Sequence, residues 1–425
     1  MKRKKLIILG AGISGLVAGE ILSRYFNVQI LEKEGYIGGL ASNFEHDSRQ
    51  IPRYYHHIIK SNNYTQEYLK KFMDVKQLNW KKIKVSIGVD GKISMINSPF
   101  GLLNFQYLNF YEKIRFGLFG IYSLYLMNPS KIPEEMDVES WLNNLAGKAV
   151  TQKIFYNLYG RNKFNIPLKD ISAKQFANRL HEKEIQDFFS FPKEGYQKMI
   201  DNLGNRIREN NGKIEVNSKI TKIDLVKKQL IKNGKKIKYD LLLSTIPFEI
   251  FLKISRGLPK DYSNKLSKIK YCPCVGLCFG TKELLHPKSY WINLFGERIH
   301  IIMQHSLLNN SYKEKINWCL RYGGSEEDLN LPEKEIKDKY LGVIKKYFPK
   351  AEIIWAKVFR TKYAEPIYDI NYHKYMPKYK SPVKGLYFAG IQLTHPKIRN
   401  INVAIKSGID ASDTILKDKG IIISS

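Results

Sequence analysis

The chain has 425 residues, enough for two domains that share a large core. Hydrophobic residues make up 43% and charged residues 26%, which is typical of a folded globular protein and argues against long disordered stretches. The formal net charge is +30 and is spread along the whole chain. This charge favours an anionic partner such as phospholipid or a phosphorylated substrate, while a compositional bias with a solvated basic surface explains it equally well. Nucleic acid is the least favoured partner, because no nucleic-acid-binding module is visible.

Four cysteines in a chain of this length do not form a disulfide framework, so we expect a reducing, cytoplasmic compartment. Cys272, Cys274 and Cys278 alternate along an apolar run and point to the same side of a predicted strand. A metal site there lacks a partner motif, since no Cys-x-x-Cys or His-x-x-x-His pair lies nearby. We therefore predict buried packing for these thiols and no metal.

The predicted elements begin with a short apolar strand, Leu6 to Leu9, followed by a glycine turn, a helix to about Tyr25 and a strand from Val28 to Leu31. The basic residues ahead of this run make it look superficially like a signal peptide. A folded strand, turn and helix fits better, because the run contains repeated glycines and no small-residue cleavage site follows. Such a βαβ unit opens a parallel sheet.

A hairpin is predicted from 85 to 97, with its turn at Val89-Asp-Gly-Lys92. A long helical stretch follows, from about 100 to 185. Its apolar segment from Ile114 to Met127 is too short to span a bilayer. We expect a buried helix there, and the alternative is a face that dips into a membrane. Further strands are predicted at 213–216, 220–224, 240–247, 273–280, 299–304, 318–322, 353–359 and 385–390, before a helix from Val403 to Lys417.

The first glycine turn, Gly10-Ala-Gly12-Ile-Ser-Gly15, follows a strand and opens a helix. Gly10 permits a tight turn, Gly12 lets a pyrophosphate approach the backbone, and Gly15 allows close packing of helix on strand. The free N–H groups of the helix, from Ile13 and Ser14 onward, then face the diphosphate. Glu32 ends the second strand, where its carboxylate accepts hydrogen bonds from ribose hydroxyls. This pattern predicts a dinucleotide site for NAD or FAD.

The continuation of the chain resembles the amine-oxidase-like flavoproteins. After Glu32 and Lys33 comes a second glycine pair, Gly38-Gly39-Leu40-Ala41, which in that superfamily crosses the diphosphate again without a Cβ in the way. The stretch that begins at Phe191 resembles the superfamily's Pro, Gly-Gly, helix and strand segment. In that segment the following strand, here around Ile220, contacts adenine through its backbone. The resemblance implies FAD as the cofactor.

The last part of the chain resembles the C-terminal flavin motif of the same superfamily. Gly385-Leu-Tyr-Phe-Ala-Gly390 precedes a helix whose N-terminus points at the flavin ring and stabilises negative charge there. The implied cofactor contacts are Gly390, Asn400, Ile401 and Ala404. One departure is clear, because the superfamily often has an acid directly after Ala-Gly and this chain has Ile391 and Gln392. Whether Gln392 replaces that acid is left open.

Within the superfamily, the chain resembles the protoporphyrinogen-oxidase-like group through Tyr54-Tyr-His-His-Ile-Ile59, the Trp141 helix and Tyr290-Trp-Ile-Asn293. This resemblance implies an α/β fold, in which a Rossmann-type FAD-binding domain is interleaved with an α+β substrate domain. The implied FAD-binding segments are 1–84, 191–250 and 366–425. The implied substrate segments are 85–190 and 251–365.

The same resemblance places the segment from Arg53 to Lys60 near the flavin face. His56 and His57 are adjacent, so in an extended segment they point opposite ways and at most one faces the substrate. An imidazole there is an acid or base candidate, or else it is held by the core or by a backbone carbonyl. Arg399 is a candidate for binding an anionic substrate group or a flavin phosphate. Weaker candidates for the pocket are Lys362, Tyr363 and Trp291.

These features predict an FAD-dependent oxidoreductase that takes hydride from a small hydrophobic or anionic substrate. An isomerase like UDP-galactopyranose mutase is the alternative, although that family's His-Lys-Tyr-Gly-Pro-His segment differs from Arg53-Tyr-Tyr-His-His57 and its arginine clamp is not visible. A flavin-bound structural factor is a third interpretation. We expect a cytoplasmic protein, with peripheral contact to an anionic membrane as the further option.

Overall fold

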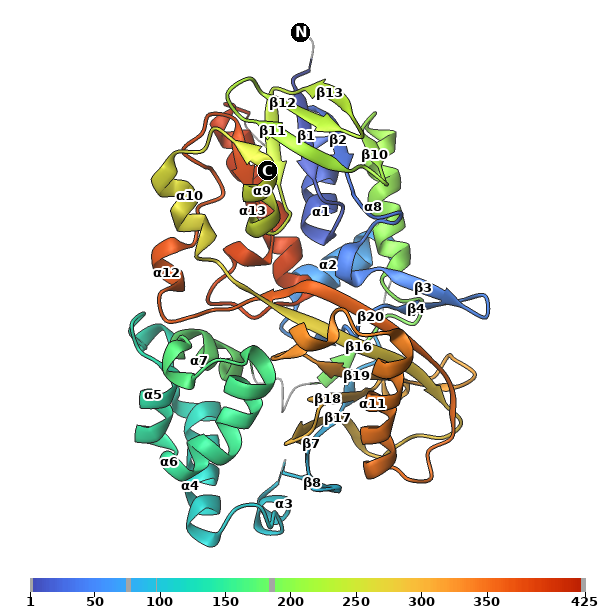
Figure 1. The fold of residues 1–425 in the computed structure, drawn as a ribbon, viewed down its shortest axis with the longest axis vertical. Helices are drawn as coiled ribbons and strands as arrows, with labels where there is room; N and C mark the ends of the chain where they lie inside the picture. Colours follow the sequence, from blue (N-terminus) through green and yellow to red (C-terminus); the bar gives the residue numbers. More distant parts are fainter. Residues whose placement is uncertain (1–2, 74–77, 97, 183–187, 422–425) are drawn as a thin grey trace.

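The computed structural model describes residues 3–73, 78–96, 98–182 and 188–421 (Figure 1). A five-stranded parallel sheet lies in the upper half of the view, in the order β10-β2-β1-β14-β21. Its strands are β1 (Lys5–Leu9), β2 (Asn27–Leu31), β10 (Lys213–Glu215), β14 (Leu241–Ser244) and β21 (Leu386–Phe388). Strands from early, middle and late parts of the chain therefore share one sheet, which confirms the predicted interleaved Rossmann fold.

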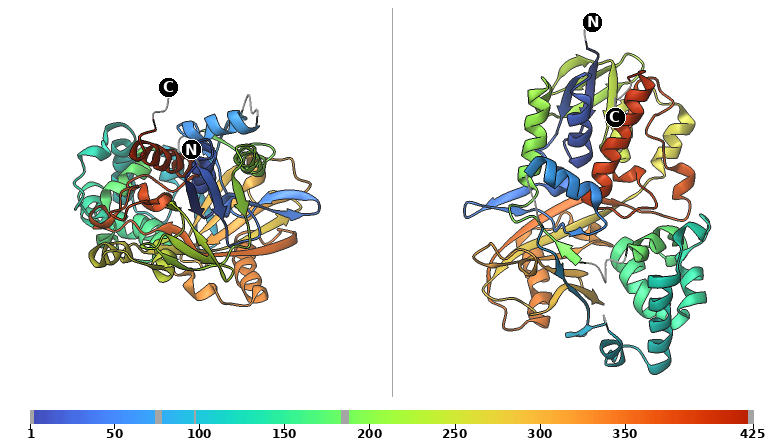
Figure 2. Two further views of the ribbon diagram at one scale, coloured as in Figure 1. Left: turned by 90° about the horizontal axis from the view of Figure 1, so that it is seen from above. Right: turned by 180° about the vertical axis from the view of Figure 1, so that it is seen from behind.

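The apolar run of β1 is explained by layers that cover both faces of this sheet. Leu6 and Ile8 pack into the core that contains the helices, while Ile7 and Leu9 belong to a separate core on the opposite face. Figure 2 shows the helical layer, which consists of α1 (Ile13–Leu22), α8 (Gln197–Glu209) and α13 (Ile401–Asp418). The opposite layer consists of α9 (Phe248–Ile254) and a sheet of β11 (Ile220–Asp224), β12 (Gln229–Lys232), β13 (Lys235–Lys238) and β15 (Ser255–Arg256).

A seven-stranded mixed sheet forms the second body, in the order β20-β16-β19-β18-β17-β7-β8. Its strands are β7 (Lys84–Val89), β8 (Lys92–Met95), β16 (Tyr271–Thr281), β17 (Ser289–Phe295), β18 (Ile301–Gln304), β19 (Lys315–Arg321) and β20 (Ile353–Pro366). On one face, Leu277 and Phe279 pack with Ile336 and Tyr340 of α11 (Glu333–Tyr347). The other face of this sheet belongs to the main core of the molecule.

The three alternating cysteines of β16 lie on that second face, as the spacing predicts. Cys272, Cys274 and Cys278 are all buried in the main core and carry free thiols. Burial raises the pKa of Cys274 to about 12, so its thiol is neutral at physiological pH. The predicted buried packing is confirmed. Within the described ranges, no group of three His, Cys, Asp or Glu side chains is placed to hold a metal ion.

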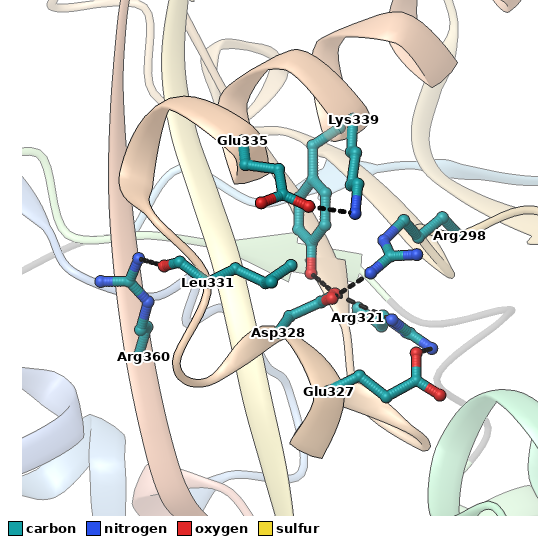
Figure 3. A network of polar contacts seen from close by, with 9 residues as sticks. Arg298, Arg321, Glu327, Asp328, Leu331, Glu335, Lys339 and Arg360 are labelled. Atoms are coloured by element: carbon teal, nitrogen blue, oxygen red, sulfur yellow. Dashed lines mark hydrogen bonds and ion pairs between the residues drawn. The ribbon is translucent and has the colours of Figure 1, made fainter.

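A buried carboxylate connects α11 to the seven-stranded sheet. Figure 3 shows Arg298 and Arg321 converging on Asp328, whose side chain is fully buried. The Arg321 guanidinium lies 2.9 Å from the carboxylate, and the Tyr340 hydroxyl donates to it at 2.8 Å. Burial alone would raise the pKa of Asp328, but the hydrogen bonds from Arg321, Tyr340 and Arg298 hold it below the usual value.

The predicted long helical stretch is broken into several pieces that form a lobe at the lower left of Figure 1. Polar N-caps start four of them: Ser98 caps the first helix, Asn109 forms a capping box with Glu112, and Asp137 and Ser172 cap two later helices. The pieces are α3 (Pro99–Leu103), α4 (Phe110–Ile121), the π-turn Tyr122–Leu126, α5 (Val138–Leu145), α6 (Lys148–Val150), the π-helix Thr151–Phe164 and α7 (Ala173–His181). Positions 183–185 of the prediction lie outside the described residues.

The expectation of a buried helix from Ile114 to Met127 is wrong for its outer face. Phe119 packs inward against Trp141 and Phe155, with ring centroids 5.9 and 5.1 Å away. In contrast, Leu118 is 60% exposed and Leu126 is 72% exposed. The segment is apolar on both sides, and the sequence pattern did not reveal that one side has no partner in the fold. Within the described residues, no helix is long and apolar enough to cross a bilayer.

The remaining local predictions concern the hairpin at 85–97 and the strand at 353–359. The hairpin is confirmed as β7 and β8, with Asp90 and Gly91 in the left-handed conformation that a tight turn requires, and residue 97 of that prediction lies outside the described residues. The strand predicted to end at residue 359 continues as β20 to Pro366. The elements that pattern analysis did not predict include β3 (Asn43–His46), β4 (Arg49–Pro52), β5 (Ile58–Ile59), α2 (Asn63–Met73), β6 (Lys81–Lys82), β9 (Phe188–Ser190), β17, α10 (Lys260–Ser267), α11 and α12 (Tyr372–Tyr375).

Candidate functional site

A cavity of about 810 Å³ lies between the parallel sheet and β20, a volume typical of small-molecule sites. Its lining brings together most of the residues singled out from the sequence. They are Gly10, Gly12, Ile13, Ser14, Glu32, Lys33, Gly38, Gly39, Leu40, Ala41, His56, Ile220, Gly390, Arg399, Asn400, Ile401 and Ala404, together with Lys362 and Tyr363. Gly15, His57 and Trp291 are not part of this lining.

The first glycine turn owes its shape to three different constraints. Gly10 has a φ of +97°, and a Cβ there would lie 2.6 Å from Thr245 Oγ1. A Cβ on Gly15 would lie 2.1 Å from the carbonyl oxygen of Gly10, so this position permits the helix to start close to the strand. Gly12 differs, because a Cβ there would meet nothing within 4 Å. Gly12 therefore leaves open the space in front of the α1 N-terminus.

The second glycine pair is bonded directly to the first turn. Gly38 donates its N–H to the carbonyl of Ala11 at 2.8 Å, and a Cβ on Gly39 would lie 3.3 Å from Gly12 Cα. Both Gly38 and Gly39 have positive φ values, of +101° and +57°. The two loops thus form one continuous cradle of backbone on the floor of the cavity.

Glu32 organises this cradle and faces the cavity. One carboxylate oxygen accepts from the backbone N–H of Ala11 at 2.8 Å, and the other accepts from the backbone N–H of Glu34 at 2.9 Å. An ionised carboxylate has about four acceptor sites, so two remain for hydroxyl donors. Glu32 therefore fixes the turn and still has capacity to bind a ribose.

The late part of the chain completes the site through α13. Asn400 caps this helix by accepting from the N–H of Val403 at 2.9 Å, and Ser14 donates to the carbonyl of Ala404 at 2.8 Å. The N-termini of α1 and α13 therefore meet at the same cavity. Gln392 is buried on its wall and donates to the carbonyl of Ala389 at 3.0 Å. Its contact with a ribityl chain stays a prediction.

These residues fit FAD. The open space at Gly12 and the free N–H groups at the start of α1, which has no acid in its first turn, suit a diphosphate. Glu32 suits the adenosine ribose, and Ile220 at the start of β11 lines the same end of the cavity. The α13 N-terminus suits the electron-rich end of a flavin ring.

His56 and His57 point to different surroundings, as their adjacency predicts. His56 lines the cavity, and its Nε2 lies 2.9 Å from the carbonyl of Leu40. His57 packs on Phe189 with ring centroids 4.6 Å apart, and its Nδ1 lies 3.3 Å from the Tyr290 hydroxyl. Burial lowers the pKa of His56 to about 4 and that of His57 to about 3. Both imidazoles are therefore neutral at physiological pH, and neither is an imidazolium donor.

Arg399 stands between the cofactor cradle and the second body. It lines the cavity, while its Nη2 donates to the Tyr322 hydroxyl at 3.2 Å and its Nε lies 3.5 Å from Glu365. These partners follow β19 and end β20, so the guanidinium faces the substrate body. Of the weaker candidates, Lys362 pairs with Glu249 at 2.7 Å.

Arg53 opens the segment that the family resemblance places near the flavin face, and it lines the cavity. It lies over the ring of Tyr36, with 4.0 Å from its guanidinium carbon to the ring centroid. Sequence reasoning missed most of the wall that β20 provides, the continuous stretch 357–363, in which only Lys362 and Tyr363 were candidates. Long-range pairing decides which strand lies over the cradle, so no local signal marks residues 357–361.

The comparison with family models agrees with this geometry. Residues 13–416 match the family described as flavin containing amine oxidoreductase. The chain is also 21% identical to the chloroplastic/chromoplastic 15-cis-phytoene desaturase of Arabidopsis thaliana, over 100% of this chain and 82% of that protein. An uncharacterized protein of Methanocaldococcus jannaschii is 25% identical, over 73% of this chain and 79% of its own length.

Solved structures share the fold at low identity. A protein of Exiguobacterium sp. 255-15, assigned provisionally as a protoporphyrinogen oxidase, has a TM-score of 0.79 and 15% identity, and the match covers 98% of this chain and all of that one. Reduced UDP-galactopyranose mutase has a TM-score of 0.77 and 16% identity, covering 99% and 96% of the two chains. Putrescine oxidase bound to putrescine has a TM-score of 0.76 and 14% identity, covering 98% and 99%.

The family match covers residues 13–416, nearly the whole chain, and includes Glu32, the Gly38-Gly39 pair, the seven-stranded sheet and most of α13. The chain therefore belongs to the flavin-containing amine oxidoreductases and is an FAD-dependent oxidoreductase.

Proposed function

We propose that this protein removes a hydride from a small molecule bound between the cofactor cradle and the second body. The observation that supports this most directly is the single cavity lined by the glycine loops, by His56 and by Arg399. Bound FAD supplies the hydride acceptor. The protein then has to bind and orient the substrate and keep water away from it.

The residues around the cavity suit that role. The hydrogen bond from His56 Nε2 to the Leu40 carbonyl fixes the ring and leaves Nδ1 as an acceptor, because the imidazole is neutral. Arg399 carries a fixed positive charge that a substrate group can meet. His57 acts from outside the cavity, by packing behind Trp291 and Tyr290. We therefore propose contact with substrate for His56 and Arg399, and a positioning role for His57.

The test is anaerobic bleaching of the yellow, FAD-loaded protein by panels of amines, alcohols and compounds with saturated C–C bonds. We expect one class to reduce the flavin, and His56→Asn to slow that reduction at least about tenfold. The matched control is His57→Asn, which alters the adjacent imidazole outside the cavity and should slow reduction less. Isomerisation of UDP-galactofuranose without net flavin reduction would instead favour the mutase-like function.

We further propose that the protein works attached to an anionic membrane. The outer helical face of α3, α4 and the following π-turn exposes large apolar side chains by 45% to 78%. They are Phe100, Leu103, Phe110, Tyr111, Ile114, Leu118, Ile121, Tyr125 and Leu126. Soluble proteins rarely expose so many neighbouring apolar groups without a partner. Along α4 these residues recur every three or four positions, which places them on one stripe.

The charged residues around this apolar face favour a lipid surface as its binding partner. Residues 98–131 contain one acid and three bases, and the acid, Glu112, is buried and paired with Lys153 at 2.8 Å. Lys113 and Arg115 lie on the helix beside the exposed stripe. A basic border around an apolar face is the arrangement that binds anionic headgroups while the apolar groups enter the interface. The face lies at the end of the molecule opposite the parallel sheet (Figure 1).

Co-sedimentation with phosphatidylglycerol and phosphatidylcholine vesicles tests this proposal. We expect binding to phosphatidylglycerol that weakens with salt, and at least about a tenfold loss in the double variant Leu118→Glu, Ile121→Glu, because burying each of these side chains stabilises the bound state by about 1.5–3 kcal/mol. The matched control is Val226→Glu, which changes a side chain that is 79% exposed far from this face. Equal binding by both variants, or a stable dimer that the double variant dissociates, would contradict the proposal.

A further inference from the structure

Arg399 belongs to a buried cluster of charges behind the cavity. Lys163, near the end of the π-helix, and Arg399 share a single carboxylate, that of Glu365 in β20. Glu365 is fully buried, and the side chains of Lys163 and Arg399 are only 12% and 15% exposed. Burial alone would raise the pKa of Glu365, but Lys163 and Arg399 hold it below the usual value, so the carboxylate is ionised.

This cluster carries more positive than negative charge. Two cations, Lys163 and Arg399, contact one carboxylate, that of Glu365. Two neighbouring groups that could ionise, Cys274 and Tyr322, add no negative charge at physiological pH. Burial raises the pKa of the Cys274 thiol to about 12 and that of the Tyr322 hydroxyl well above its usual value. A buried charge without a counter-charge is costly unless a ligand supplies one.

The hydrogen bonding of Arg399 is also incomplete. A guanidinium has five N–H donors, and within the described part of the chain this one makes a single hydrogen bond, from Nη2 to Tyr322. Its Nε is buried and has no hydrogen-bond acceptor among the described residues. Neither oxygen of Glu365 has a hydrogen bond of good geometry among the described residues, although Oε2 is ion-paired with both Lys163 and Arg399. The guanidinium therefore has donors left for an acceptor that enters the cavity.

We propose that Arg399 binds a carboxylate or phosphate group of the substrate, with Glu365 holding the guanidinium in place and Lys163 adding positive charge behind it. The cofactor diphosphate is not the anion in question, because the glycine cradle provides its site and the partners of Arg399 all lie in the second body. Planar guanidinium groups favour carboxylates and phosphates, with which they form two parallel hydrogen bonds. This proposal rests on the proposed function, since it names the class of molecule that the oxidoreductase accepts.

The net positive charge of the cavity lining also favours an anionic substrate. Its lining contains seven basic and two acidic residues. They are Lys33, Arg53, Lys219, Lys357, Arg360, Lys362 and Arg399, and Glu32 and Glu34. Glu249 and Glu365, which lie outside this lining, pair with Lys362 and Arg399, and the two negative charges of a diphosphate still leave part of the remaining excess uncompensated. An anionic substrate reduces that imbalance, and the field also raises the rate at which anions enter.

The test uses small anions and measures binding, independently of turnover. FAD-loaded protein is titrated with benzoate, phenyl phosphate and the neutral analogue benzamide, and the change in the flavin absorbance spectrum gives each dissociation constant. We expect benzoate or phenyl phosphate to bind at least about tenfold more tightly than benzamide, because the charge-assisted contact is the stronger one. The stronger of the two anions identifies the substrate group as a carboxylate or a phosphate.

Two variants assign that binding to the cluster. Lys163→Met, which removes a cation outside the cofactor cavity, should weaken anion binding about tenfold and leave benzamide binding and FAD affinity unchanged. Glu365→Gln should tighten anion binding, because both cations then lose their shared carboxylate. The control is Lys282→Met, which removes an exposed lysine paired with Glu352.

Several results would overturn the proposal. These are equal affinities for benzoate and benzamide, no spectral change with any anion, or unchanged anion binding in Lys163→Met. Flavin bleaching by an uncharged substrate would overturn it as well, while leaving the proposed hydride transfer intact. Conversely, anion binding without bleaching by any compound would sustain the anion site and count against the proposed reaction.

Discussion

Gly10 and Gly12 are two positions apart, yet the missing side chains have different consequences. Gly10 has a positive φ and no room for a Cβ, whereas Gly12 has an ordinary φ and open space ahead of it. We predict that Gly12→Ala leaves the thermal stability of the FAD-free protein unchanged but weakens FAD binding at least about tenfold, because its methyl group occupies the space for the diphosphate. Gly10→Ala should lose about 1–3 kcal/mol of stability as well.

Thermal unfolding of the FAD-free variants and FAD titration by fluorescence quenching together check this split. If Gly12→Ala binds FAD as the wild type does, the diphosphate does not approach the backbone at that turn. If Gly10→Ala is as stable as the wild type, the close contact with Thr245 is not a constraint.

Asp328 supports a prediction about pH. Its pKa is held below the ordinary 3.8, so its contribution to stability is present above that value and is lost as the pH falls through the lower pKa of the folded state. We predict that Asp328→Asn lowers the free energy of unfolding by about 3 kcal/mol at neutral pH, because two arginines lose their buried partner. Urea denaturation at neutral and acidic pH should show the difference from the wild type narrowing in acid. A difference that is constant with pH would exclude an ionic origin.

At the scale of elements, the packing of α1 on α13 positions both helix N-termini at the cofactor cavity. A Cβ on Gly408 of α13 would lie 2.7 Å from the backbone carbonyl of Ser14 and 2.9 Å from Val17. We predict that Gly408→Ala lowers the stability by about 1–3 kcal/mol and weakens FAD binding, because the helices must separate. The matched control is Gly342→Ala in α11, where a Cβ meets nothing within 4 Å. That change should raise the stability by up to about 1 kcal/mol.

Calorimetry of the two alanine variants, with and without FAD, provides the measurement. Gly408→Ala with wild-type FAD affinity would mean that the helix contact stabilises the fold without shaping the site.

The elements that could be predicted from the sequence are those with a local cause. β1 and β14 contain apolar runs because layers cover both faces of the sheet, and the turn at Gly10 needs a glycine because its φ is positive. The outer face of α4 shows the limit of this approach. Its apolar residues predict burial, and only the packed structure shows that Leu118 has nothing in the fold to cover it.

The site divides in the same way. The cradle was predictable because its glycines and Glu32 lie within a short stretch of chain. The charged cluster was not, since Lys163, Glu365 and Arg399 come from a π-helix, a strand and the approach to α13. Their meeting depends on how the two bodies pack, and a buried charge pair has no sequence periodicity. Similarly, adjacency predicted that His56 and His57 diverge, but the structure shows which one lines the cavity.

At the scale of the whole molecule, the cofactor site joins distant parts of the chain. We predict that removing FAD lowers the melting temperature and weakens amide protection in α1, α13 and β20 together, because one ligand spans all three. A hundredfold excess of FAD over its dissociation constant adds about 2.7 kcal/mol of stability. Hydrogen exchange monitored by mass spectrometry can compare the two forms. A loss of protection confined to α1 would mean that α13 and β20 do not hold the cofactor.

The position of β21 in the chain has a consequence for biosynthesis. This edge strand begins at Leu386, and α13 follows it, so a ribosome has synthesised both the other strands of the sheet and the second body before the nucleotide-binding sheet can close. Until then the nascent chain holds β14 without its neighbour β21. FAD is therefore expected to bind only after α13 has been synthesised. Translation products that end before this helix are expected to be colourless.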